Sequence, residues 1–184
     1  MKTYISILRG INVGGKNIIK MQSLREMFEA MGFQKVRSFI QSGNVIFQHD
    51  DTTNAELEKL ITEEILKRFT MKIPVIVIKL TELKSIIKQN PFAKEHEDIS
   101  KLYVTILSKE PEKLLAESVK KISFPPDEYI LKKRAIYLHL PNGAAKTKLT
   151  IDLFEKKLNV IATSRNLNTL NELVKIGDFV SNEE

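Results

Sequence analysis

One pattern constrains the fold of this chain more than any other, because it occurs twice in the same order. Short runs rich in β-branched and apolar residues predict strands, and apolar residues at helical spacing predict helices. Each half gives strand, helix, strand, strand, helix, strand, with a hairpin in the middle. This order predicts an α+β fold of duplicated ferredoxin-like βαββαβ units, whose antiparallel sheets carry helices on one face.

The predicted elements divide the chain into two halves and a connection. Residues 1–80 form the first ferredoxin-like half, residues 81–100 a connecting helix and a polar linker, and residues 101–184 the second half with an extra C-terminal helix. The halves share little residue identity, so the repeat is one of element order. The hairpin in each half argues against a fully parallel, doubly wound sheet.

Helix boundaries are predicted from capping patterns. Serine or threonine followed three residues later by glutamate forms a capping box, and glycine is favoured just beyond a helix end. On this basis, helices begin at Ser23 with Glu26, at Thr53 with Glu56 and at Thr169 with Glu172, and the first and last of them end at Gly32 and Gly177.

The absence of cysteine and of long apolar runs limits the class of protein. Without cysteine the chain has no disulfides, thiolate metal sites or cysteine nucleophiles, which fits a reducing compartment. The N-terminal run lacks the features of a signal peptide, and no apolar stretch approaches the ~20 residues of a membrane span. We expect a cytoplasmic protein with no membrane partner, and no motif calls for a cofactor or metal.

Basic charge is concentrated at the N-terminal end. The net charge is +6, and residues 1–49 hold seven basic residues against two acidic ones. Such a field attracts phosphates, nucleic acid or acidic partners, although a solvated basic surface is the simpler alternative.

The loop after the first strand matches most of a P-loop pattern, with Gly10, Gly15 and Lys16 at the right spacing. A P-loop would carry serine or threonine at Asn17 to hold magnesium, and its helix would begin at the lysine rather than near Ser23. We therefore exclude a P-loop nucleotide triphosphatase.

A looser prediction remains for the loop from Arg9 to Asn17. Glycines such as Gly14 leave backbone N–H groups exposed, so the loop can surround one anionic group with Arg9 and Lys16 nearby. The element order places the hairpin turn Gln41–Asn44 at the same end of the sheet, as a neighbour of this loop. The alternatives are a tight crossover loop with solvated charges and an ordinary hairpin turn.

In the second half, the same topology groups Lys146 and Lys148, in the loop after the hairpin, with Arg165 and Asn166 at the end of the last strand. Both groups lie at the end of the sheet opposite to its hairpin.

Single-stranded nucleic acid is a second predicted ligand. RNA-recognition modules share the βαββαβ order and stack bases on aromatic residues of two strands. Tyr4 and Phe47 hold these places in the first half, and Tyr103 and Tyr137 in the second, on what would be a helix-free face. The basic and aromatic octamer of those modules is absent.

No catalytic group is evident. His49 and His96 lie in polar segments, His139 lies on a strand, and none has metal-ligand spacing. The chain is a binding protein or an enzyme without a recognisable catalytic residue.

Several motifs carry a resemblance. The run from Leu8 to Asn17, the run from Gln41 to Val45, and Ala162 to Asn166 with Thr169 closely resemble a bacterial family, Domain of Unknown Function 1697. The resemblance spans nearly the whole chain and implies a duplicated ferredoxin-like fold. It implies no activity, but its motifs fall on the loops discussed above.

The leading hypothesis is a small phosphorylated or carboxylated ligand bound where these loops meet. Nucleic-acid binding and a protein-interaction module without a ligand are the alternatives. The predicted site residues are Arg9, Gly10, Asn12, Gly14, Gly15, Lys16, Ser42, Gly43, Asn44, Arg165 and Asn166.

Overall fold

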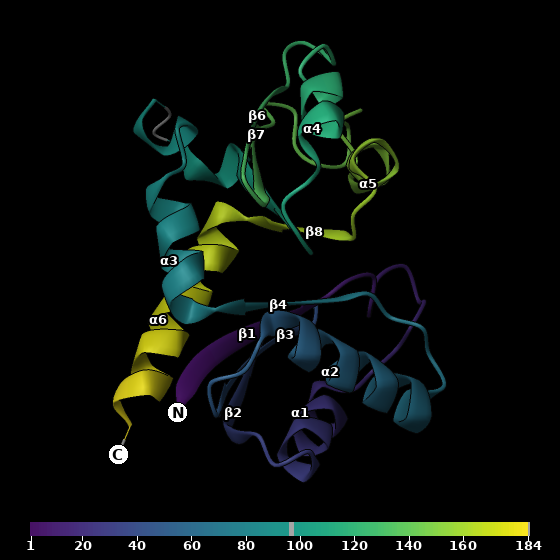
Figure 1. Ribbon diagram of the computed structural model, residues 1–184, viewed down its shortest axis with the longest axis vertical. Coiled ribbons are helices and arrows are strands. Elements are labelled where there is room, and N and C mark those ends of the chain that lie inside the picture. Colours follow the sequence, from purple (N-terminus) through teal and green to yellow (C-terminus); the bar gives the residue numbers. More distant parts are fainter. Residues whose placement is uncertain (96–97, 184) are drawn as a thin grey trace. The chain divides into compact units, whose positions relative to one another are not determined.

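The computed structural model describes residues 1–95 and 98–183, so His96 of the predicted linker lies outside the described residues. Contacts divide the chain into two compact units, one of Met1–Lys84 with Glu172–Glu184 and one of Ser85–Asn171. Each unit contains a four-stranded antiparallel sheet (Figure 1).

The first unit has the predicted order of strands and helices. Its sheet has the strand order β2-β3-β1-β4, in which the central strand β1 pairs with β3 and β4. Its elements are β1 (Lys2–Leu8), α1 (Met21–Ala30), β2 (Gln34–Phe39), β3 (Asn44–His49), α2 (Asn54–Phe69) and β4 (Val75–Lys79).

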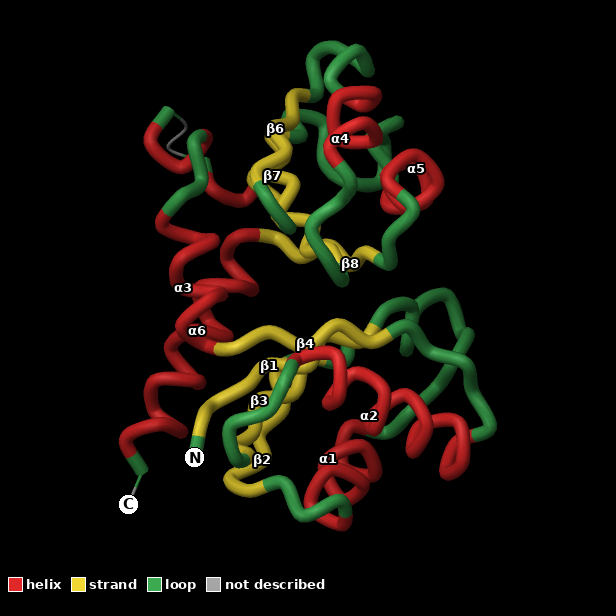
Figure 2. Tube along the Cα trace, in the orientation of Figure 1, coloured by secondary structure: helices red, strands yellow, loops and turns green. Residues whose placement is uncertain are grey.

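Helices α1 and α2 cover one face of the first sheet (Figure 2). Tyr4 and Phe47 are cross-strand partners and stack with ring centroids 5.7 Å apart. Phe28 of α1 meets Phe47 edge-on at 5.4 Å. Because each large side chain contributes about 1.5–3 kcal/mol when fully buried, this aromatic group is a main source of stability.

The C-terminal part of α6 (Leu167–Asn182) packs on the other face of the first sheet. The Gln48 side-chain amide donates to the Val180 carbonyl at 3.1 Å, and the Thr3 and Ser181 hydroxyls share a hydrogen bond of 2.7 Å. Thr3 and Gln48 are cross-strand partners. Alternation along the strands places them on the face opposite to Tyr4, so helices lie on both faces of this sheet.

Helix α6 approaches α3 (Leu80–Lys88) closely at Gly177. A Cβ atom at Gly177 would lie 2.7 Å from Leu80 Cδ1, and Lys84 forms an ion pair with Asp178. The prediction that the last helix ends at Gly177 was therefore wrong. The glycine permits close helix packing, and the helix continues past it.

The second unit repeats the arrangement with the strand order β6-β7-β5-β8. α4 and α5 pack over one face of its sheet, where Phe154 and Tyr129 meet edge-on at 5.2 Å. Its elements are β5 (Leu102–Leu107), α4 (Lys113–Val119), β6 (Glu128–Lys132), β7 (Ala135–His139), α5 (Ile151–Leu158) and β8 (Ala162–Asn166), and short 3₁₀ turns at Phe92–Lys94 and Ile99–Lys101 precede β5. The duplicated ferredoxin-like fold is thus confirmed.

One of the three predicted capping boxes is confirmed. At the start of α2, Glu56 N–H donates to Thr53 Oγ1 at 3.2 Å, and Thr53 N–H donates to the Glu56 carboxylate at 3.0 Å. The prediction for α1 was wrong, because this helix begins at Met21 after Lys20, which makes no side-chain capping bond. Ser23 therefore lies inside the helix.

The predicted capping box of α6 was also wrong. The helix begins at Leu167, two residues before Thr169. The Asn166 side-chain oxygen accepts a hydrogen bond of 2.9 Å from Asn168 N–H, which satisfies a donor of the first turn. None of the helices within residues 1–95 and 98–183 has the length and apolar character that a membrane crossing requires.

Candidate functional site

Asn12 organises the glycine-rich loop between β1 and α1. Its side-chain amide donates to the Ile19 carbonyl at 2.9 Å, and its side-chain oxygen accepts from Ile19 N–H at 2.9 Å. The same amide donates to the Gln41 carbonyl at 2.8 Å. One side chain therefore closes the base of the loop and joins it to the β2–β3 turn.

The tip of the loop is a two-residue turn. Lys16 N–H donates to the Val13 carbonyl at 3.1 Å, and the two central residues, Gly14 and Gly15, have φ angles of +58° and +74°. Positive φ at both central positions is what a type I′ turn requires, and glycine adopts it without steric cost. No side chain with a Cβ would fit this backbone equally well.

Three carbonyl groups of the loop, those of Gly10, Val13 and Asn17, accept hydrogen bonds within it. Asn17 side-chain N–H donates to the Gly10 carbonyl at 2.9 Å, and Asn12 N–H donates to the Asn17 carbonyl at 3.2 Å. In contrast, Gly14 and Gly15 are exposed, and their N–H groups have no acceptor among the described residues. The tip of the loop therefore leaves two successive backbone N–H groups available.

The β2–β3 turn packs tightly against the loop. Leu8 N–H donates to the Gly43 carbonyl at 2.9 Å. A Cβ at Gly43 would lie 2.7 Å from Ile11 Cδ1 and 2.8 Å from Leu8 Cβ, at a φ of +79°. The prediction that the loop and the turn are neighbours is thus met, and only glycine fits at this contact.

The remaining polar residues of the turn mainly hold its shape. The fully buried Asn44 side chain donates to the Phe39 carbonyl at 3.2 Å and to the Ser42 hydroxyl at 3.0 Å. Two basic residues of the loop were predicted to attract an anion. Lys16 is exposed, whereas Arg9 is partly buried, and its backbone N–H donates to the Pro74 carbonyl at 3.0 Å. Asn12, Gly43 and Asn44 therefore hold the loop and the turn in shape, whereas the side chain of Lys16 is exposed.

Three exposed apolar side chains flank this loop and turn, and sequence reasoning missed them. Val13 and Ile18 lie in the loop with 63% and 58% of their surface exposed, and Ile40 precedes the turn with 49% exposed. Ile18 and Ile40 each adjoin a residue that Asn12 holds. Isolated apolar residues in a loop carry no periodic pattern, so no sequence signal points to them.

Arg165 and Asn166 lie on β8 in the second unit, and their place in one site with the glycine-rich loop stays a prediction. Arg165 donates to the Ser164 carbonyl at 2.8 Å, and burial lowers its pKa to about 10, which leaves it charged at neutral pH. Asn166 donates to the Ser100 carbonyl at 2.7 Å. Lys148 lies over the Phe124 ring, with its amine 5.7 Å from the centroid.

The tyrosines do not form an open stacking surface. Tyr4 is fully buried among the residues under α1 and α2, and its hydroxyl donates to the Thr52 carbonyl at 3.0 Å. Tyr103 and Tyr137 face opposite sides of the second sheet, because Tyr103 pairs with Leu138 and Tyr137 with Val104. Tyr137 is buried and donates to the Ile86 carbonyl at 2.9 Å. The expectation of a helix-free aromatic face was wrong.

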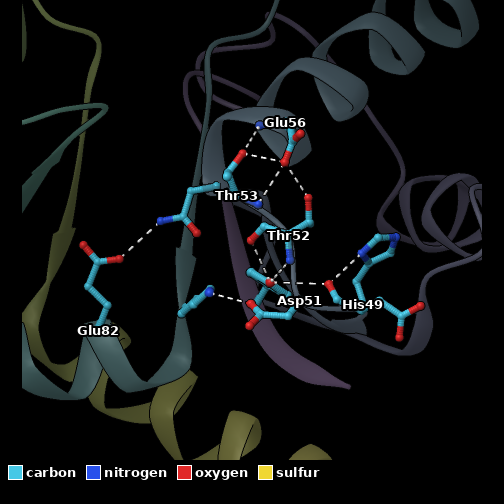
Figure 3. A network of polar contacts seen from close by, with 10 residues as sticks. His49, Asp51, Thr52, Thr53, Glu56 and Glu82 are labelled. Atoms are coloured by element: carbon cyan, nitrogen blue, oxygen red, sulfur yellow. Dashed lines mark hydrogen bonds and ion pairs between the residues drawn. The ribbon is translucent and has the colours of Figure 1, made fainter.

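A polar network surrounds the start of α2 (Figure 3). Glu56 accepts hydrogen bonds from the hydroxyls of Thr52 and Thr53, and these bonds lower the pKa of its carboxyl to about 2. Lys79 forms an ion pair of 2.6 Å with Asp51 beside it. The network lines a shallow hollow of about 730 Å³, and no group of three or more His, Asp or Glu residues in the described parts of the chain could hold a metal. We assign it to helix capping.

A comparison with protein families finds one model that matches residues 1–137, and it describes a protein of unknown function (DUF1697). The chain belongs to the DUF1697 family. This confirms the resemblance to the family. In this DUF1697 protein, the matched residues include the first sheet with α1, α2 and α3, and β5, β6 and the start of β7 in the second sheet, but not β8 or α6.

A solved structure has the same fold as this DUF1697 protein. It is described as the structure of conserved bacterial protein SP0830 from Streptococcus pneumoniae, and it is 22% identical. The alignment covers 96% of this chain and 98% of that chain, with a TM-score of 0.76. At this identity the likeness supports the fold alone. No match was found among curated proteins.

Proposed function

We propose that this DUF1697 protein binds a small ligand bearing a phosphate or carboxylate group at the loop from Arg9 to Asn17. The observation that carries the proposal is the exposed, positive-φ glycine turn at the tip, next to the exposed Lys16. Gly14 and Gly15 are exposed, and their N–H groups have no acceptor among the described residues. Successive free N–H groups form a concave site for an anion.

The loop is also held ready for a ligand. Asn12 fixes its base with three hydrogen bonds, and Gly43 fits against Ile11 and Leu8 without room for a methyl group. A loop that is already ordered loses less conformational entropy on binding. The exposed amine of Lys16 and the basic N-terminal segment supply the attractive charge.

A thermal-shift panel tests the proposal, with inorganic phosphate, sugar phosphates, nucleotides, carboxylates and short oligonucleotides at low and moderate salt. A ligand at a hundred times its Kd stabilises the folded state by about 2.7 kcal/mol, roughly a 5–10 °C rise for a chain of this size. We expect a small anion to give this rise and Lys16→Ala to reduce it. Lys67→Ala, at another highly exposed lysine, is the matched control.

Two further variants distinguish the contribution of the loop backbone from that of the Lys16 charge. Gly15→Val places a β-branched residue at a φ of +74° and should abolish the thermal shift. Asparagine tolerates this φ, so Gly15→Asn should retain most of the shift.

A shift unaffected by Lys16→Ala and Gly15→Val would place the ligand elsewhere. A shift only with oligonucleotides, lost as salt rises, would favour nucleic acid. No shift at all would favour a protein-interaction module. Loss of the shift in Arg165→Ala would support one site shared with β8.

A further inference from the structure

Strand β6 is an edge of the second sheet with an open side. In the strand order β6-β7-β5-β8 it pairs only with β7 among the described strands. In an antiparallel pair only alternate residues bond to the neighbour, so the other backbone N–H and C=O groups of β6 point outward. Such an edge is a template for another strand.

The β6 sequence is complementary to itself when two copies run antiparallel. It reads Glu128, Tyr129, Ile130, Leu131, Lys132, with an acidic residue first, apolar residues in the middle and a basic residue last. A twofold axis through Ile130 would set Glu128 of each copy opposite Lys132 of the other. Opposite charges at directly facing positions stabilise strand pairs.

The register of this twofold arrangement also matches the hydrogen-bonding pattern of the β6 backbone. A two-residue turn, Lys133–Arg134, joins β6 to β7 and makes Lys132 and Ala135 the closing pair. Bonded pairs alternate along an antiparallel ladder, so Ile130 bonds inward to β7 while Tyr129 and Leu131 have their backbone groups outward. In the twofold arrangement Tyr129 of one copy faces Leu131 of the other, which is a bonded pair.

Exposure of β6 agrees with such an interface. Ile130 leaves 36% of its surface exposed, and the Glu128 side chain leaves 58% exposed although it also pairs with His139 at 3.0 Å. Beside the strand lies a groove of about 790 Å³, lined by α4 and by residues of β6 that include Tyr129 and Leu131. A second copy of Leu131 would project along this groove.

We propose that two copies of this protein associate through antiparallel β6–β6 pairing about a twofold axis at Ile130. Each copy contributes the same surface, as in closed dimers of this symmetry. A strand of five residues makes a small interface, so the dimer is weak and depends on concentration.

Sedimentation velocity from low to high micromolar concentration tests the dimer. The mass of the wild type is expected to rise from 21.1 kDa toward twice that value. Glu128→Lys and Lys132→Glu each place like charges opposite one another and should weaken association at least tenfold. A mixture of the two single variants restores both charge pairs and should form a heterodimer. Lys67→Glu, at an exposed position far from β6 in the sequence, is the control and should dimerise like the wild type.

A cross-link gives a second readout. The chain has no cysteine, so Ile130→Cys introduces a single thiol. Facing residues of a non-bonded antiparallel pair have Cα atoms about 4.5 Å apart, within reach of a disulfide. Mild oxidation should link Ile130→Cys chains covalently, whereas Leu114→Cys, at a position 84% exposed, should remain mostly unlinked.

Three results would overturn the proposal. One is a wild type that stays at the mass of a single chain throughout the concentration range. Another is a dimer that neither charge variant weakens, because it must use another surface. The third is a mixture of Glu128→Lys and Lys132→Glu that fails to associate when each variant is folded by circular dichroism.

Discussion

The side-chain amide of Asn12 lies 2.8 Å from the carbonyl oxygen of Gln41, and this hydrogen bond joins the glycine-rich loop to the β2–β3 turn. The residues are 29 positions apart, on the β1–α1 loop and the β2–β3 turn. Asn12 also has a positive φ of 55°, which asparagine tolerates better than most residues. Asn12 therefore has a structural role in the glycine-rich loop.

Asn12→Ala should destabilise the protein by about 2–3 kcal/mol, because three hydrogen bonds of about 1 kcal/mol each are lost. Urea unfolding measures this change. Asn12→Asp retains the oxygen that accepts from Ile19 N–H but sets a carboxylate oxygen against the Ile19 and Gln41 carbonyls, so its loss of stability should be at least as large. Equal stabilities for Asn12→Ala and the wild type would contradict the role assigned here.

Gly43→Ala should be much more damaging than Gly143→Ala. The two glycines have similar φ angles of +79° and +82°, so alanine meets similar backbone strain at both. A Cβ at Gly43 would lie 2.7 Å from Ile11 Cδ1, whereas a Cβ at Gly143 has nothing within 4 Å. We expect Gly143→Ala to lose about 1 kcal/mol and Gly43→Ala at least 1–3 kcal/mol more from overpacking. Thermal unfolding of both variants gives the comparison. Similar losses of stability would mean that Ile11 and Leu8 move aside to accommodate the added methyl group.

Ser6→Ala should leave stability unchanged or raise it by about 1 kcal/mol. Its hydroxyl is fully buried in β1 and has no hydrogen-bond partner within residues 1–95 and 98–183. Removing a buried polar group without a partner removes a desolvation cost. The control is Ser181→Ala, which loses hydrogen bonds to Thr3 and to the Gly177 carbonyl and should destabilise the protein. A marked loss in Ser6→Ala would indicate a bound water or ligand at that hydroxyl.

Glu56 should make stability fall in acid. The hydroxyls of Thr52 and Thr53 lower the pKa of its carboxyl from 4.5 to about 2 in the folded state. The folded state therefore favours the ionised form, so this stabilisation is complete above about pH 5 and is lost as pH falls toward 2. Glu56→Gln should be less stable at pH 7 and should lose less stability between pH 7 and pH 3.

The matched control for this pH dependence is Glu63→Gln. Glu63 lies on the same helix and makes only an exposed pair with Lys59 at 4.0 Å. Its substitution should leave the acid dependence close to that of the wild type in urea unfolding at both pH values. Identical pH profiles for Glu56→Gln and the wild type would show that the capping box does not hold the carboxylate in solution.

The prediction that the glycine-rich loop and the β2–β3 turn are neighbours is confirmed, and the ligand-binding roles of their residues stay predictions. Element order alone placed the glycine-rich loop beside the β2–β3 turn, because the end of β1 and the start of β3 must share one end of the sheet. It did not reveal that Asn12 and Asn44 use their amides on backbone carbonyls. Those bonds join residues that are adjacent only in three dimensions.

Tyr4 and Gly177 show where local patterns fail. Alternation places a tyrosine on one of two faces, but the helices that cover each face decide whether it is open or buried, and α1 and α2 bury Tyr4. A glycine late in a helical pattern is typical of a helix end. Gly177 instead lies where α6 passes Leu80 of α3, a contact that no local pattern contains.

The sequence by itself determined the order of the elements, the duplicated fold class and the position of the specialised loop. These depend on hydrophobic periodicity, glycine and turn chemistry, which act over a few residues. Only the tertiary structure decided which sheet faces are covered, how far α6 extends, and which polar groups of the loop remain available. Those outcomes depend on contacts between residues far apart in the chain, such as Gln48 with Val180, and burial is a property of the whole packed unit.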